Sequence, residues 1–200
     1  MSNAENNVNN PSRREMLVGL TLCPAAALLG GMAGLASGQE TASSEQPPVE
    51  PGASRASQAG TGLFPNYADI YGIAPEVAKK IMSGLYGGIG HLGGTCSTVT
   101  GAVILLGLRH STVGVDNDEV AYPKMVALAK QFAEDFKERY KSILCRERTQ
   151  CDISTPELYA LAKQTPEIFT DCYEGAKVIA ELLETKYDIL NPPKTGESTQ

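Results

Sequence analysis

The chain has 200 residues, of which 42% are hydrophobic and 20% charged, with a formal net charge of -6. This length leaves room for one domain with an ordinary core once the terminal segments are set aside. The acidic balance argues against nucleic acid or an anionic membrane surface as a partner.

Near the N-terminus, Arg13 and Arg14 stand directly before an uncharged run from Met16 to Ala36. The run is rich in Leu, Ala and Gly, and it is only mildly hydrophobic. This combination resembles a twin-arginine (Tat) export signal of bacteria and archaea. The resemblance implies passage through the Tat translocon of a protein that is already folded, often with a cofactor in place. We therefore expect a periplasmic or otherwise extracytoplasmic protein.

The end of this run contains the small residues that a signal peptidase needs before its cut. We predict a signal peptide over residues 1–38, cleaved after Ala36 or after Gly38. Cleavage would also remove Cys23. The alternative is an uncleaved membrane anchor, because the run is about 20 residues long and could span a bilayer.

Residues 39–62 consist of Ser, Ala, Gln, Pro and Gly with almost no large apolar side chain. Such a segment cannot bury enough surface to offset chain entropy, so we predict a flexible linker. Residues 191–200 have a similar composition and are predicted to be a disordered tail. The domain is therefore expected over residues 63–190. Its longest apolar stretch, Val99 to Leu108, is too short for a membrane span and favours a buried helix.

Within this domain the apolar residues follow the 3.6-residue period of an α-helix, and strand-like alternation is nearly absent. We predict an all-α fold, a compact bundle of about four to five helices. Thr155 and Thr165 each precede Pro-Glu, which is typical of a helix start. Pro123 is expected in the first turn of its helix, where its missing N–H is harmless. The expected helices, in chain order, cover residues 74–85, 96–108, 118–142, 156–163 and 166–187.

Four cysteines fall inside the helical region, at Cys96, Cys145, Cys151 and Cys172. Cys96 follows a glycine-rich segment, residues 87–94, and with Thr95 as N-cap it would be the first residue of a helix. The unpaired backbone N–H groups and the helix dipole there favour a thiolate and lower the thiol pKa. We expect Cys145 just past the long helix, Cys151 in a polar loop and Cys172 two turns into the last helix.

Several short motifs around these cysteines match one known pattern. They are Gly87-Gly88-Ile89-Gly90, Gly94-Thr95-Cys96, Thr100 to Leu108, Phe136 to Tyr140, Cys145-Arg146-Glu147 and Cys151 to Glu157, with Cys172 after them. Together they resemble the C_GCAxxG_C_C family of proteins, which is regarded as redox-active. The resemblance covers roughly Pro75 to Leu183. It implies that Cys96, Cys145 and Cys172 are the family's cysteine positions.

Two features depart from the family's pattern. Members usually carry an earlier cysteine before the glycine-rich segment, whereas this chain has none over residues 64–70. Cys151 is additional to the pattern and could substitute for it. The central signature is also loose, because Ser97 follows the cysteine and Gly101 stands five positions on.

Three hypotheses for the cysteines stay open. The first is a redox-active cluster for electron transfer, or a zinc or iron–sulfur site held by Cys96, Cys145, Cys151 and Cys172, with His91 as a weak further ligand. The second is a non-enzymatic binding module with two structural disulfides, Cys145–Cys151 and Cys96–Cys172. The third is catalytic thiol–disulfide exchange with Cys96 as the attacking thiolate.

Of these, the sequence favours an exported redox-active protein that works with a redox partner protein and touches a membrane only through an uncleaved signal. Residues 88–93 also match the GxGxxG pattern of dinucleotide sites. Such a site needs a strand before the glycines, and helical sequence stands there instead, so we expect none.

Overall fold

The structure is a computed structural model that describes residue 55, residues 62–165 and residues 167–193. The predicted signal peptide, nearly all of the linker and residues 194–200 of the tail lie outside the described residues. Within them the secondary structure is helical, as the all-α prediction requires. The elements are α2 (Leu63–Tyr67), η4 (Ala68–Tyr71), α3 (Pro75–Met82), α4 (Ser97–His110), α5 (Asp118–Tyr140), α6 (Cys145–Thr149), α7 (Pro156–Lys163) and α8 (Glu167–Thr185).

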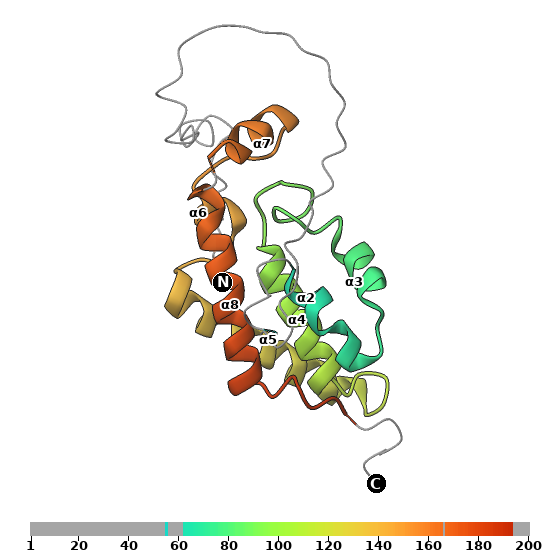
Figure 1. The fold of residues 1–200 in the computed structure, drawn as a ribbon. Coiled ribbons are helices and arrows are strands. Elements are labelled where there is room, and N and C mark those ends of the chain that lie inside the picture. The colour runs from blue at the N-terminus through green and yellow to red at the C-terminus, as the bar shows by residue number, and fades with distance from the viewer. Residues whose placement is uncertain (1–54, 56–61, 166, 194–200) are drawn as a thin grey trace, which may run out of the picture.

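Helix α4 is the central element of the bundle and packs against α2, α5 and α8 (Figure 1). Its apolar run forms much of the core, and Val99, Leu105 and Leu106 are buried. Gly101 lets α2 approach closely, because a Cβ there would lie 3.2 Å from Cβ of Phe64. The continuous hydrophobic character of this helix in the sequence is therefore explained by neighbours on several sides.

Helix α5 is the long amphipathic helix that the sequence predicts, and it buries Phe132 and Phe136 against the core. It starts at an N-cap, Asn117, whose side chain accepts a hydrogen bond from the backbone N–H of Glu119. The prediction for Pro123 is wrong: it lies inside the helix, in the second turn. There its missing N–H removes one helical hydrogen bond.

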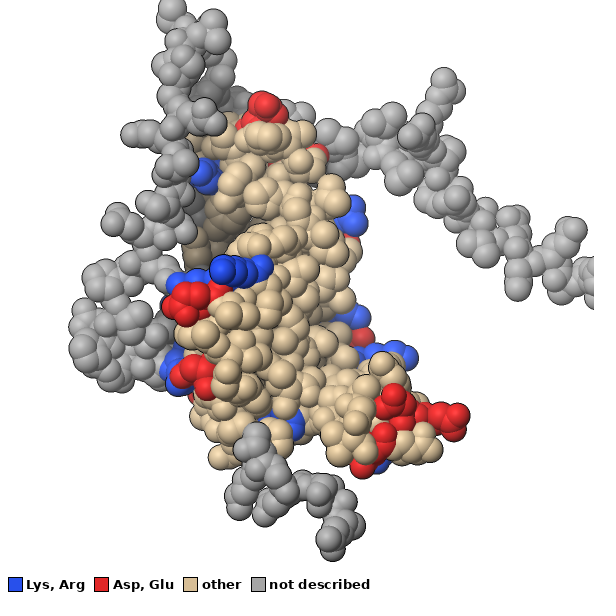
Figure 2. All heavy atoms as spheres, turned by 90° about the vertical axis from the view of Figure 1, so that its right-hand side faces the viewer, with Lys and Arg blue, Asp and Glu red and all other residues tan. Residues whose placement is uncertain are grey.

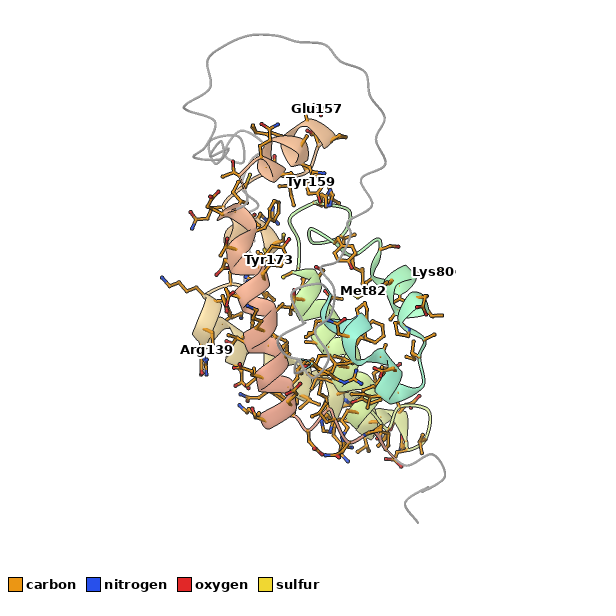
Figure 3. All side chains as sticks on the ribbon, viewed as in Figure 1. Lys80, Met82, Arg139, Glu157, Tyr159 and Tyr173 are labelled. Atoms are coloured by element: carbon orange, nitrogen blue, oxygen red, sulfur yellow. The ribbon has the colours of Figure 1, made fainter. Side chains whose placement is uncertain are left out.

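Helix α7 covers a second, smaller group of buried residues, made of Cys145, Cys151, Ile153 and Ala162. Thr155 caps α7 as predicted, by accepting a hydrogen bond from the backbone N–H of Leu158. Tyr159 reaches from α7 toward the glycine-rich segment, where its ring lies 4.3 Å from that of His91 (Figure 3). This contact ties α7 to the rest of the fold.

Hydrogen bonds from side chains join α5 and α2 to the C-terminal end of the domain. Asp135 on α5 accepts hydrogen bonds from Lys186 Nζ at 2.5 Å, Tyr187 Oη at 2.6 Å and Gln131 Nε2 at 2.9 Å. Buried Tyr67 donates from Oη to Glu184 at 2.6 Å. The end of α8 is therefore fixed from two sides.

The surface on the α3 side carries its charged residues mainly toward the edges, with uncharged residues between them (Figure 2). Val77 and Ile81, two large apolar residues of α3, are exposed. In the described part of the chain, no helix combines the length and the apolar character needed to cross a membrane.

Candidate functional site

A short backbone pairing brings two of the cysteines together. Thr95 and Leu144 form an antiparallel bridge. On either side of it, the N–H of Cys96 donates to Ile143 O at 2.8 Å, and the N–H of Cys145 donates to Gly94 O at 2.7 Å. In antiparallel pairing, Cys96 and Cys145 are then diagonal neighbours on one face.

The glycine-rich segment before Cys96 is shaped for this pairing. Gly88 has a φ of +74°, and a Cβ there would lie 2.4 Å from the backbone N and O of Gly94. Only glycine fits such a position without displacing the backbone. The close approach of Gly88 to Gly94 therefore positions the chain that carries Cys96 to the bridge.

Cys96 is the N-cap of α4 and not its first residue, as the sequence had predicted, because the helix begins at Ser97. Its side chain makes no capping hydrogen bond to the helix. The sulfur instead accepts a hydrogen bond from Nη1 of Arg148 at 3.1 Å. The hydrogen-bond partner of the Cys96 sulfur is thus the guanidinium group of Arg148, and not the backbone N–H groups at the start of α4.

Arg148, on α6, lies at the centre of the site, and its side chain is 1% exposed. Nη2 donates to the backbone O of Asp171 at 2.7 Å and to its Oδ2 at 3.1 Å. The guanidinium also lies over two rings, 5.1 Å from the centre of Phe136 and 4.8 Å from that of Tyr140. Hydrogen bonds and ring contacts thus hold a buried cation against the Cys96 sulfur.

Arg148 is the residue that sequence reasoning missed. Its signal was present as Cys145-x-x-Arg148, since residues three apart share one face of a helix. The role of Arg148 could be predicted only with knowledge of two helices. The first is α6, which carries Arg148, and the second is α8, where Gly175 leaves room for the guanidinium. A Cβ on Gly175 would lie 2.3 Å from Arg148 Nη2.

Cys96, Cys145 and Cys172 are free thiols close enough for charge on one to affect the others. Burial raises the pKa of Cys145 to about 11, with Cys96 and Cys172 adding to the rise and Arg148 opposing it. Burial also raises the pKa of Cys172, and Arg148 again opposes the rise. Three of the four cysteines that the sequence placed in one cluster thus lie near one cation, Arg148.

Cys151 and His91 take other places. Cys151 lies in the connection between α6 and α7, as the predicted loop requires, but its side chain is buried in the second group with Cys145. The ring of His91 packs against that of Tyr159 at a tilt of 31°. Because Cys96, Cys145 and Cys172 are free, neither predicted disulfide, Cys145–Cys151 or Cys96–Cys172, is formed in this structure.

The described donors do not fit a metal site. Among the described residues, no group of three or more His, Cys, Asp or Glu side chains is placed to hold one ion. A zinc or iron–sulfur site would need several thiolates turned to one centre. Here the cation beside the Cys96 sulfur is the guanidinium of Arg148.

Residues 60–186 match the model of the family described as "Putative redox-active protein (C_GCAxxG_C_C)". The chain belongs to this family. No curated protein and no solved structure matches it. In this C_GCAxxG_C_C protein, the three cysteines that the sequence assigned to the family pattern all lie within electrostatic range of Arg148.

Proposed function

We propose that this C_GCAxxG_C_C protein carries electron pairs by reversible thiol–disulfide chemistry at Cys96, Cys145 and Cys172. One observation carries the proposal: Arg148 donates a hydrogen bond to the Cys96 sulfur beside two other free thiols. Arg148 also lowers the pKa of Cys145 and of Cys172 against the effect of burial, and the thiolate is the reactive form in thiol–disulfide exchange. The redox-active description of the family supports the same chemistry.

The reaction exchanges one disulfide for another. A thiolate of this site attacks one sulfur of a disulfide on a partner protein, and the second partner sulfur leaves as a thiolate. A second cysteine of the site, after losing its proton, attacks the mixed disulfide and releases the first partner sulfur. The site loses two electrons and two protons and gains one disulfide, while the partner disulfide becomes two thiols. In the reverse direction, the disulfide of the site oxidises a dithiol on a partner protein, and the site returns to two thiols.

The test is a redox titration of the full chain in glutathione buffers, with thiols counted by alkylation and mass spectrometry. We expect two thiols of the three-cysteine site to be lost together and to return on reduction. Cys96→Ser should abolish this paired loss, whereas Ser97→Ala, the neighbouring control, should leave it unchanged. Thiols that stay reduced at every buffer potential would contradict the proposal. Stoichiometric iron or zinc in protein purified without oxygen would also contradict it.

We also propose that the protein is exported through the Tat translocon and acts outside the cytoplasm. Arg13, Arg14 and the uncharged run of residues 16–36 support this, and all lie outside the described residues. Replacing both arginines by lysine keeps the charge and should abolish export in a bacterial host, measured by cell fractionation. Ser12→Ala is the matched control. Unchanged export of the double-lysine variant would contradict the proposal.

A further inference from the structure

The three cysteine residues of the site differ in how far each residue is exposed to solvent. Cys96 is 5% exposed and Cys145 is 7% exposed, whereas Cys172 on α8 is only partly buried. A disulfide on another protein must touch the sulfur that attacks it. As the molecule is folded, Cys172 is the most exposed residue of the three, although burial raises the pKa of its thiol as well.

We infer that Cys172 exchanges with the redox partner and that buried Cys96 and Cys145 then take over the disulfide. This inference rests on the proposed function and assigns an order to its thiols. It also changes the expected role of Cys96, which sequence reasoning made the first attacking thiolate. Its burial makes it the second nucleophile.

Arg148 connects the outer thiol to the inner ones. Its Nη1 donates to the Cys96 sulfur, and its Nη2 donates to the backbone O of Asp171, the residue before Cys172. The two nitrogens belong to one planar group, so Cys96 and the start of α8 are held on the same guanidinium. The Thr95–Leu144 bridge makes Cys145 a second neighbour of Cys96, diagonal to it across the pairing. Cys96 therefore lies between the other two thiols in the network of contacts.

The relay is balanced at each step. The Cys172 thiolate attacks a partner disulfide and forms a mixed disulfide, and one partner thiolate leaves. The Cys96 thiolate then attacks the Cys172 sulfur, which forms Cys96–Cys172 and releases the second partner thiolate. Deprotonated Cys145 attacks the Cys96 sulfur and moves the bond to Cys96–Cys145, and Cys172 leaves as a thiolate. The last step is an internal exchange without net oxidation, and it returns a free thiol to the surface.

The experiment uses the reduced full chain and glutathione disulfide as the probe, with each adduct located by peptide mass spectrometry. In Cys96→Ser, which blocks the second step, we expect glutathione to accumulate on Cys172. In Cys172→Ser, we expect the initial rate to fall at least about tenfold, because the remaining site thiols are buried. Cys145→Ser should still form Cys96–Cys172. Circular dichroism of each variant checks that the fold is kept, and Cys172→Ala repeats the test with a second side chain.

The outcomes separate the order of thiols from the proposed function. If Cys172→Ser forms an internal disulfide at the wild-type rate, the partner reaches Cys96 directly, and the inferred order is overturned while the redox function stands. If the wild type keeps glutathione on Cys172 and forms no internal disulfide, the proposed function is overturned together with the relay. Glutathione on Cys172 in Cys96→Ser, together with a slow Cys172→Ser variant, supports the order.

Discussion

At the scale of single residues, Arg148 is a buried charge with few compensating partners. The buried guanidinium has one carboxylate neighbour, Asp171, whose side chain is about half exposed, and one sulfur, Cys96. Its Nε has no hydrogen-bond partner among the described residues. A buried donor without a partner costs about 1–3 kcal/mol. The position is therefore unfavourable for stability, which is common where a charged group serves chemistry.

The variant Arg148→Met tests whether Arg148 lowers the pKa of the neighbouring thiols at a cost in stability. Arg148 lowers the pKa of both Cys145 and Cys172 against the effect of burial, so its loss should raise both values further. Fewer thiolates at neutral pH should slow exchange with glutathione disulfide. The free energy of unfolding should change little or rise by about 1 kcal/mol, because an apolar side chain replaces a buried charge. Stopped-flow exchange and urea unfolding measure the two effects. An unchanged exchange rate would contradict the role given to Arg148.

Gly175 can be tested by the smallest possible change. Gly175→Ala places a methyl group 2.3 Å from Arg148 Nη2 and should displace the guanidinium. We expect a loss of about 1–3 kcal/mol in the free energy of unfolding, as for other overpacked sites, and slower thiol exchange. Gly107→Ala is the matched control, since it lies in α4 with no atom within 4 Å of the new Cβ. The control should be neutral or stabilising by up to about 1 kcal/mol. Equal effects of the two changes would contradict the steric argument.

At the scale of elements, the glycine-rich segment is the support that carries Cys96 to the bridge. Gly88→Ala combines an unfavourable φ of +74° with a clash against Gly94. We expect it to destabilise the fold by about 2 kcal/mol. It should also lower the yield of the Cys96–Cys145 disulfide relative to Cys96–Cys172. Peptide mapping after oxidation measures that ratio.

Gly84→Ala is the control for this change, because a Cβ there meets nothing within 4 Å and its φ is not positive. It should leave both stability and the disulfide ratio unchanged. A normal ratio in Gly88→Ala would show that the segment does not position Cys96.

The sequence predicted the long elements well because their patterns are local. The periodic apolar stripe of α5 and the Thr-Pro-Glu start of α7 each indicate a helix without knowledge of the neighbours. The short elements α2, η4 and α6 were not predicted, since a helix of one turn has too few residues for a period to show. Pro123 was misplaced because the start of α5 depends on the Asn117 cap.

The site was predicted in part for the same reason. Three of its cysteines follow from the family resemblance, and Cys96 at a helix start follows from the glycines before it. Arg148 could not be found, because its partners Cys96, Phe136 and Asp171 come from three other segments. Burial of Cys96 could not be foreseen either, since it depends on how α6 and α8 pack over the start of α4.

At the scale of the whole molecule, the contact between α5 and the end of α8 makes stability depend on pH. Burial alone raises the pKa of Asp135, but hydrogen bonds from Lys186, Tyr187 and Gln131 outweigh it and hold the pKa below its usual value. The unfolded chain has an ordinary aspartate pKa of about 3.9. The stabilisation is therefore fully present above about pH 4–5 and is lost as the pH falls toward the folded pKa.

Asp135→Asn should reduce the free energy of unfolding by about 2 kcal/mol at pH 7, because hydrogen bonds to a charged group are replaced by weaker ones. The difference from the wild type should shrink below about pH 4, where the wild-type carboxylate gains its proton. Urea unfolding at several pH values measures it. Glu134→Gln is the control, since its pair with Lys137 is exposed and should contribute less than about 1 kcal/mol. A difference that is constant over the pH range would contradict this origin.

The pairing of Thr95 with Leu144 has a consequence for how the chain folds. Closing the loop between residues 95 and 144 costs about 3 kcal/mol of chain entropy before any packing compensates for it. Contacts across such a distance form late relative to local helices. Until then, no guanidinium holds Cys96, and every cysteine of the nascent chain can cross-link with any other. A chain that refolds in a reducing medium and is oxidised afterwards should therefore contain fewer non-native disulfides than a chain that is oxidised before it refolds.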